Sequence, residues 1–267
     1  MRDLIISLTT TPPRMGMITP TLQDLLAQHA FVQEIRLNIP RSYRRFEFDL
    51  NQLPQFPPGI RVVLVGEDFG PATKILPTVR DHAGQDIDIL FCDDDQRYEK
   101  DWAARFVETR QQQPTACLVE SGYDLPYKHA NRTLFPRAEQ RKKDLRYRLF
   151  RAATALQRRP PPYTKSGYVD ILRGYRGAMV HAYDFLDTVF DIPDILWTVD
   201  DVWLSGQLAL NNVPVWLLAD VPPSVPAPKA DKIEALRTFT YKGHDRRLAD
   251  ASCVAFFQEN YNIWQPA

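Results

Sequence analysis

The chain has 267 residues, of which 44% are hydrophobic and 25% are charged, so it can bury one sizeable core and is neither disordered nor fibrous. Thirty-three basic side chains balance thirty-three acidic ones, and this zero net charge removes the general attraction expected of a nucleic-acid-binding protein. The longest apolar runs are far shorter than the roughly 18 residues of a membrane-spanning helix, and the first residues do not have the form of a signal peptide. Cys92, Cys117 and Cys253 are odd in number and lack metal-ligand spacing, which suits a reducing cytoplasm.

Short β-rich runs alternate with helical patterns in the first half of the chain. This alternation predicts a single Rossmann-like α/β domain, with a mostly parallel central sheet and helices on both faces. The predicted strands are Leu4–Leu8, Glu34–Ile39, Ile60–Val65, Ile87–Cys92 and Ala116–Glu120. The predicted helices are Thr19–His29, Thr73–Val79 and Glu99–Arg110. Ligands of such sheets bind beyond the carboxyl ends of the strands, so we expect the site in the loops that follow them.

A strongly basic segment follows at residues 121–165. Between Arg132 and Arg159, ten basic residues accompany two acidic ones. Apolar residues recur there at helical spacing, which predicts a basic amphipathic helix within residues 137–159; they are Leu145, Leu149, Ala152 and Leu156. The favoured interpretation is a solvated helix whose apolar stripe packs on the sheet. The alternatives are contact with an acidic acceptor or peripheral contact with the inner face of an anionic membrane.

The last hundred residues return to mixed structure. Gly174–Val180 is typical of a glycine-bracketed turn that enters a strand, and Pro214–Leu218 predicts another strand. Between them, Asp200–Leu210 predicts a helix that opens with two carboxylates. A final segment contains His244.

Three consecutive carboxylates, Asp93, Asp94 and Asp95, follow the predicted strand Ile87–Cys92. Like charges this close together are costly unless a cation neutralises them. Mg²⁺ and Mn²⁺ prefer oxygen ligands and often keep substrate phosphates in their shell. The run therefore predicts a site for a divalent cation and a diphosphate; the alternative is that these acids cap the next helix or lie in solvent.

A second acidic pair, Asp200 and Asp201, opens the predicted helix Asp200–Leu210. Carboxylates at a helix N-terminus interact favourably with the helix dipole, which is the structural interpretation. The functional interpretation is a general base, with Trp197 and Trp203 excluding water and raising its pKa. The residues alone leave both interpretations open.

These motifs together resemble the GT-A-type nucleotide-sugar glycosyltransferases. The segments Gly70–Lys74 and Asp200–Gly206 resemble a bacterial branch of that superfamily. The resemblance covers roughly residues 1–220 and rests on four motifs in chain order: Thr9-Thr10-Thr11-Pro12-Pro13-Arg14, the Asp-x-Asp of Asp93–Asp95, the loop Gly174–Gly177 and the pair Asp200–Asp201. The pair departs from the family, which more often has Glu-Asp at this place. Which of the two carboxylates acts therefore stays open.

The resemblance implies a role for each matching residue. Asp93 and Asp95 would bind Mn²⁺ or Mg²⁺, with Asp95 as the more direct ligand and His244 as a third candidate. Asp201 would be the general base, with Asp200 as the alternative. The implied donor-binding residues are Thr9, Thr10, Arg14, Lys74, Asp93, Asp94, Gly174 and Gly177.

The implied reaction moves a sugar from a nucleoside-diphosphate sugar, with UDP as the expected carrier, to a hydroxyl of a glycan or another acceptor. Inversion is expected, retaining chemistry stays open, and bacterial polysaccharide or glycoconjugate synthesis is the expected setting. The alternatives are a non-catalytic nucleotide- or glycan-binding module and a metal-dependent phosphohydrolase, which normally has its Asp-x-Asp near the first strand. The expected division is a nucleotide-binding half at 1–120, a basic insertion at 121–165, an acceptor and catalytic half at 166–220 and a C-terminal extension at 221–267.

Overall fold

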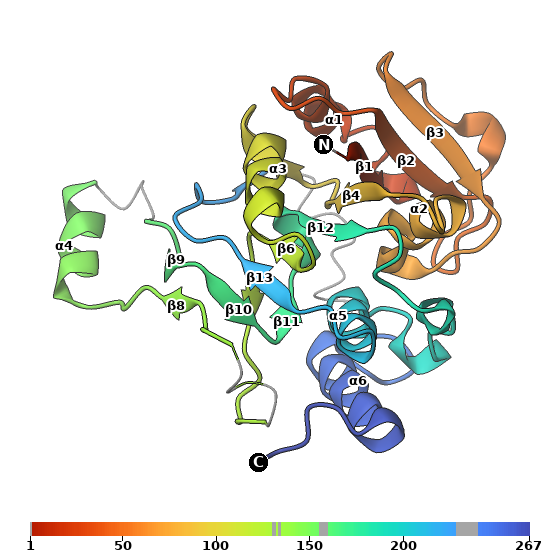
Figure 1. Cartoon of the computed structure of the whole chain (residues 1–267). Coiled ribbons are helices and arrows are strands. Elements are labelled where there is room, and N and C mark those ends of the chain that lie inside the picture. The colour runs from red at the N-terminus through yellow and green to blue at the C-terminus, as the bar shows by residue number, and fades with distance from the viewer. Residues whose placement is uncertain (1, 130–131, 133–134, 155–159, 228–239) are drawn as a thin grey trace.

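The computed structural model describes residues 2–129, 132, 135–154, 160–227 and 240–267. Its centre is an eight-stranded sheet of order β10-β13-β6-β12-β4-β1-β2-β3 (Figure 1). The strands are β1 (Asp3–Thr9), β2 (Glu34–Pro40), β3 (Ile60–Val65), β4 (Ile87–Phe91), β6 (Cys117–Val119), β10 (Gly167–Val169), β12 (Ala178–His181) and β13 (Val215–Leu217). Among these described strands, β10 and β12 alone run antiparallel to their neighbours. The prediction of an α/β fold with a mostly parallel sheet is therefore confirmed.

Helices cover both faces of the sheet. Successive residues of β1 point to opposite faces, so they show which helices pack on each one. Leu4, Ile6 and Leu8 belong to one core with residues of α1 (Thr19–Leu26) and α3 (Trp102–Gln112). Ile5 belongs to a second core with residues of α2 (Leu76–Asp81) and α5 (Asp200–Leu210). The predicted two-sided arrangement of helices is confirmed.

The helix predicted at Thr73–Val79 begins later than expected. Residues Gly70–Lys74 form a turn of 3₁₀ helix, and α2 runs from Leu76 to Asp81. Pro77 lies in the first turn of α2, where the missing N–H of proline has no hydrogen bond to lose. Lys74 therefore lies at the end of the 3₁₀ turn and is not part of α2.

A third core joins α5 to α6 (Arg246–Tyr261), a helix that the sequence patterns did not indicate. Trp203 of α5 packs against Phe257 of α6, with 5.2 Å between ring centroids, and Cys253 is buried beside them.

Short strand pairs lie around the main sheet: β5 (Gln96–Arg97) with β14 (Val225–Pro226), and β7 (Gly122–Tyr123) with β11 (Ile171–Leu172). No helix within the described ranges could span a membrane. All three cysteines are buried and unpaired.

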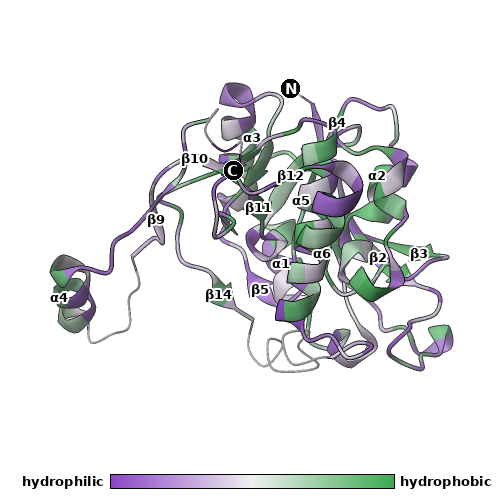
Figure 2. Cartoon of the chain, turned by 90° about the horizontal axis from the view of Figure 1, so that it is seen from below, coloured by the Kyte–Doolittle hydropathy of each residue, from purple (hydrophilic) through white to green (hydrophobic). Residues whose placement is uncertain are grey.

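The interpretation of the basic helix as packed on the sheet is wrong. Helix α4 (Leu145–Ala153) stands away from the body of the molecule, as both views show (Figures 1 and 2). It is carried by the antiparallel pair β8 (Glu139–Gln140) and β9 (Tyr163–Lys165), which leads the chain outward and leaves no sheet for the stripe to cover. Residues 155–159 of the predicted helix, including Leu156, lie outside the described residues. We call residues 139–154 and 160–165 the arm.

Candidate functional site

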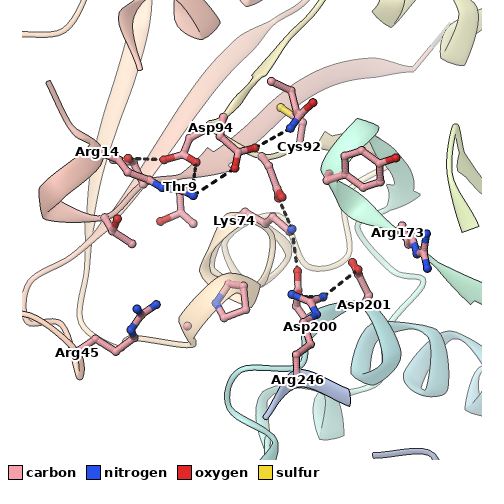
Figure 3. Close-up of a pocket in the computed structure, with 18 of the residues that line it drawn as sticks. Thr9, Arg14, Arg45, Lys74, Cys92, Asp94, Arg173, Asp200, Asp201 and Arg246 are labelled. Carbon is pink, nitrogen blue, oxygen red and sulfur yellow. Dashed lines mark hydrogen bonds and ion pairs between the residues drawn. The ribbon is translucent and has the colours of Figure 1, made fainter. Parts of the chain in front are cut away.

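A cavity of about 710 Å³ lies at the carboxyl edge of the main sheet. Because β1 and β4 are neighbouring parallel strands, the loops that follow them meet at this edge. Nine of the predicted site residues line the cavity: Thr9, Thr10, Arg14, Lys74, Asp93, Asp94, Asp95, Asp200 and Asp201. Figure 3 shows Thr9, Arg14 and Asp94 on one side, Asp201 and Arg173 on the other, and Lys74 between them. The volume of the cavity is within the range of small-molecule sites.

Hydrogen bonds from two neighbouring residues fix the side chain of Asp94. Its carboxylate accepts hydrogen bonds from Thr10 Oγ1 at 2.6 Å and from Arg14 Nη1 at 2.7 Å. Burial raises the pKa of Asp94 to about 6, although the Arg14 guanidinium opposes this shift. Asp94 therefore fixes the loop after β1 to the loop after β4 and is poorly placed to ligate an ion.

Asp93 and Asp95 are the carboxylates of this run that could hold a metal. Their side chains are 32% and 16% exposed, and Asp95 also accepts hydrogen bonds from Arg14 and Gln96. Within the described ranges, no three or more His, Cys, Asp or Glu side chains form a metal-binding group. Two carboxylates nevertheless suit a hard cation such as Mg²⁺, which commonly takes its other ligands from substrate phosphates and water.

Lys74 connects the two acidic motifs. Its ammonium group is buried, 2.5 Å from Asp93 Oδ1 and 2.7 Å from Asp200 Oδ2 (Figure 3). Burial favours the neutral amine, but the two carboxylates outweigh it and raise the pKa of Lys74 well above its usual value. Lys74 therefore remains charged and joins the end of β4 to the start of α5.

Asp200 and Asp201 have different surroundings although they are adjacent. Burial opposes ionisation of Asp200, but Lys74 and Arg246 overcome it and lower its pKa. Burial and the neighbouring Asp200 raise the pKa of Asp201 to about 7. Asp201 accepts hydrogen bonds from the backbone N–H of Gly174 at 2.9 Å and from Arg246 Nη2 at 3.3 Å.

The two tryptophans expected to flank the acidic pair diverge. Trp197 lines the cavity and donates its indole N–H to the carbonyl of Asp68. Trp203 donates to the carbonyl of Val189 and packs against α6. The indole of Trp203 therefore belongs to the core between α5 and α6 and does not line the cavity.

The structure does not bring three predicted site residues into the cavity lining. Gly174 acts through its N–H on Asp201, and a Cβ there would come 2.8 Å from Phe91 and 3.2 Å from Lys74 Nζ. Gly177 has a positive φ of 108° and lies against the Trp102 indole, so its lack of a side chain serves packing and a turn. His244 lies in the turn before α6, where its Nδ1 faces the carbonyl oxygen of Lys242 at 3.1 Å.

Several cavity residues were missed by the sequence analysis. Arg246 lies two residues beyond His244 at the start of α6, with Asp245 as the N-cap that accepts from Leu248 N. An Asp followed by apolar residues at helical spacing is a signal that could have indicated this helix. The other missed residues include Tyr43, Arg45, Phe46, Asp68, Arg173 and Tyr175. Tyr175 lies within the loop Gly174–Gly177, in which only the glycines were predicted to act, and the other five come from loops with no recognisable pattern.

Comparisons with known proteins find only distant structural likeness. No protein-family model matches the sequence, and no curated protein matches it. The crystal structure of S. aureus TarS 1–349 is 14% identical over 99% of this chain and 73% of that chain, with a TM-score of 0.45. The same fragment in complex with UDP-GlcNAc is 14% identical over 84% of this chain and 58% of that chain, with a TM-score of 0.43. Likeness at this level does not support an argument about function. The proposed function therefore depends on the residues of the cavity.

Proposed function

We propose that this chain is a glycosyltransferase that moves a sugar from a nucleoside-diphosphate sugar, with UDP as the carrier, to an acceptor hydroxyl. The observation that supports it is one cavity at the carboxyl edge of the sheet with an acidic run on one side and an acidic pair on the other. This is the arrangement that the resemblance to the GT-A-type enzymes implies. Polysaccharide or glycoconjugate synthesis is the proposed setting.

The donor half of the cavity has suitable chemistry for a nucleotide. Tyr43 and Phe46 supply aromatic surface near the ends of β1 and β2, which suits a planar base. Arg14 and Arg45 line the same cavity and can attract phosphate oxygens. We place the nucleotide beside these residues and the diphosphate beside Asp93 and Asp95.

Asp93 and Asp95 would hold Mg²⁺ or Mn²⁺ together with the diphosphate. When bound, such an ion stabilises the negative charge that develops on a leaving diphosphate. Arg14, hydrogen-bonded to Asp94 and Asp95, presents a positive charge at the same place. Asp94 and His244 are not part of this proposed metal site.

Asp201 is the proposed general base. With a pKa of about 7, it is largely ionised at slightly alkaline pH and still basic enough to accept a proton. Asp200 is less suitable, because its ion pair with Lys74 stabilises the ionised form and weakens it as a base. Removing the acceptor proton as the hydroxyl attacks from the side opposite the diphosphate would invert the anomeric centre.

Titration calorimetry with UDP tests the donor site. We expect binding that strengthens roughly tenfold or more with Mn²⁺, because an ion held by Asp93 and Asp95 would attract the diphosphate. Asp95→Asn should remove most of the gain from Mn²⁺, whereas Asp101→Asn, at an exposed aspartate outside the cavity, should keep it. Equal UDP affinity with Mn²⁺ and with EDTA would contradict the metal site, and no UDP binding in either condition would contradict the donor proposal.

Catalysis separates this proposal from a binding module of the same fold. A panel of UDP-sugars is incubated with the protein, and UDP release to water, standing in for the acceptor, is measured. Release above the rate of the uncatalysed reaction supports an enzyme; tight UDP-sugar binding without release supports the binding module. The phosphohydrolase alternative is less favoured, since the loop after β1 carries Thr10–Arg14 and no acid.

A further inference from the structure

The arm exposes an unusual group of apolar side chains. Leu145, Leu149 and Phe150 are 70%, 61% and 44% exposed, although they lie within six residues of one another on α4. Single exposed apolar residues are normal on a protein surface, whereas a group of them on one short helix indicates a contact surface. Leu145 and Leu149 are four residues apart and therefore share a face of the helix.

Basic residues accompany these apolar side chains along the same segment. Residues 141–153 contain six basic residues and one acidic residue, in a chain whose net charge is zero. Lys142, Lys143 and Arg148 are exposed. The acidic residue, Asp144, caps α4 by accepting a hydrogen bond from Tyr147 N at 3.0 Å, so it has a structural reason to be there.

We propose that the arm docks this protein on an anionic lipid bilayer, with α4 in the plane of the interface. Leu145, Leu149 and Phe150 would enter the boundary between headgroups and acyl chains, and the neighbouring lysines and arginines would contact lipid phosphates. A soluble polyanion would satisfy the cations but offer nothing to the three apolar side chains. A bilayer satisfies both, and α4 can reach a flat surface because it stands clear of the body (Figure 2).

Vesicle co-sedimentation of the full chain tests the proposal. We expect binding to vesicles that contain phosphatidylglycerol and binding at least roughly tenfold weaker to pure phosphatidylcholine, since each cation near an anionic surface contributes about fivefold to partitioning. The double variant Leu149→Ser with Phe150→Ser should lose roughly tenfold or more of the binding. The double variant Lys143→Gln with Arg148→Gln should lose a similar amount and should be less sensitive to salt.

Matched controls keep the number and type of changes but move them off the arm. Phe31→Ser with Leu248→Ser replaces two exposed apolar residues elsewhere, and Arg41→Gln with Lys100→Gln replaces two exposed cations. Both control variants should bind vesicles like the unmodified chain. Since the assay uses no donor, its outcome does not depend on the proposed glycosyl transfer, and urea denaturation of the arm variants shows separately that the body is intact.

Three outcomes would overturn the proposal. The first is no binding to the anionic vesicles. The second is binding that the serine variant of Leu149 and Phe150 leaves unchanged, which would favour a soluble polyanion as the partner of the cations. The third is a concentration-dependent dimer in analytical ultracentrifugation that the same serine variant abolishes, without vesicle binding, which would assign the apolar face to a second copy of the chain.

Discussion

At the scale of single residues, the charge of Asp201 depends on what surrounds it. Its neighbour Asp200 lies beside Lys74, which favours the ionised carboxylate. Asp201 is buried next to that negative charge, and its pKa rises to about 7. Two adjacent aspartates at one helix start are thus divided into a charged structural partner and a titratable group suited to proton transfer.

Replacing Asp201 by asparagine should separate binding from chemistry. The Asn oxygen can still accept the hydrogen bond from Gly174 N, so UDP affinity should stay within about twofold, while UDP release should fall by roughly 10² or more because the proposed base is removed. Calorimetry and the release assay measure the two effects, and Asp101→Asn is the control. A variant with normal turnover would show that another group removes the proton.

Arg246 should set the pH at which Asp201 becomes active. Its guanidinium lies 3.3 Å from Asp201 Oδ2 and lowers the pKa of that carboxyl. The proposed base would act when ionised, so activity should appear as pH rises through this pKa, and Arg246→Gln should move the acid limb of the release profile to higher pH. Arg247→Gln, at the exposed next residue, is the control. Identical profiles for the two variants would contradict this role.

At the scale of elements, the contact between α5 and α6 explains a glycine inside a helix. Gly206 lies in α5, and a Cβ built there would be 2.2 Å from Cε2 of Phe257 in α6. The missing side chain lets the Phe257 ring lie directly on the α5 backbone. This close approach packs α6 against α5, the helix that opens with the acidic pair.

Gly206→Ala should destabilise the protein even though alanine is the better helix former by about 1 kcal/mol. The overlap with Phe257 should outweigh that gain and lower the free energy of unfolding by about 1–3 kcal/mol in urea denaturation. Gly16→Ala is the matched control, because a Cβ there meets nothing within 4 Å. An unchanged or higher unfolding free energy for Gly206→Ala would show that the two helices separate easily.

Local signals explain which elements could be predicted. Helix α5 runs from Asp200 to Leu210 as expected, and β3 runs from Ile60 to Val65 as expected. In both segments the order of apolar and polar residues is typical of the element and changes clearly where the element ends. Periodicity shows which face of a helix is apolar but not what that face meets, and for this reason the stripe of α4 was placed on the sheet wrongly.

At the scale of the whole molecule, the sequence predicts the class of fold but not the order of its strands. Strand β12 begins at Ala178, yet it pairs with β4, which ends at Phe91, and with β6, which ends at Val119. Such non-local pairings leave no trace in local patterns. The same reason explains the site: the acids at strand ends were predictable from their positions, whereas Arg246 reaches Asp201 only after α6 packs on α5.

The raised pKa of Asp201 should make the protein less stable as pH rises. Between the unfolded pKa near 3.8 and the folded pKa of about 7, the folded state holds a proton that the unfolded state has lost, so the unfolding free energy falls with increasing pH. From pH 5 to pH 8 this group should remove about 2–3 kcal/mol. The asparagine of the Asp201→Asn variant cannot titrate. Between pH 5 and pH 8 the unfolding free energy of this variant should therefore fall by about 2–3 kcal/mol less than that of the unmodified chain. The unfolding free energy of Asp101→Asn should fall as much as that of the unmodified chain. Urea denaturation at the two pH values measures the difference, and parallel losses in all three proteins would mean that Asp201 is ionised at pH 5 and that its burial does not tune it as a base.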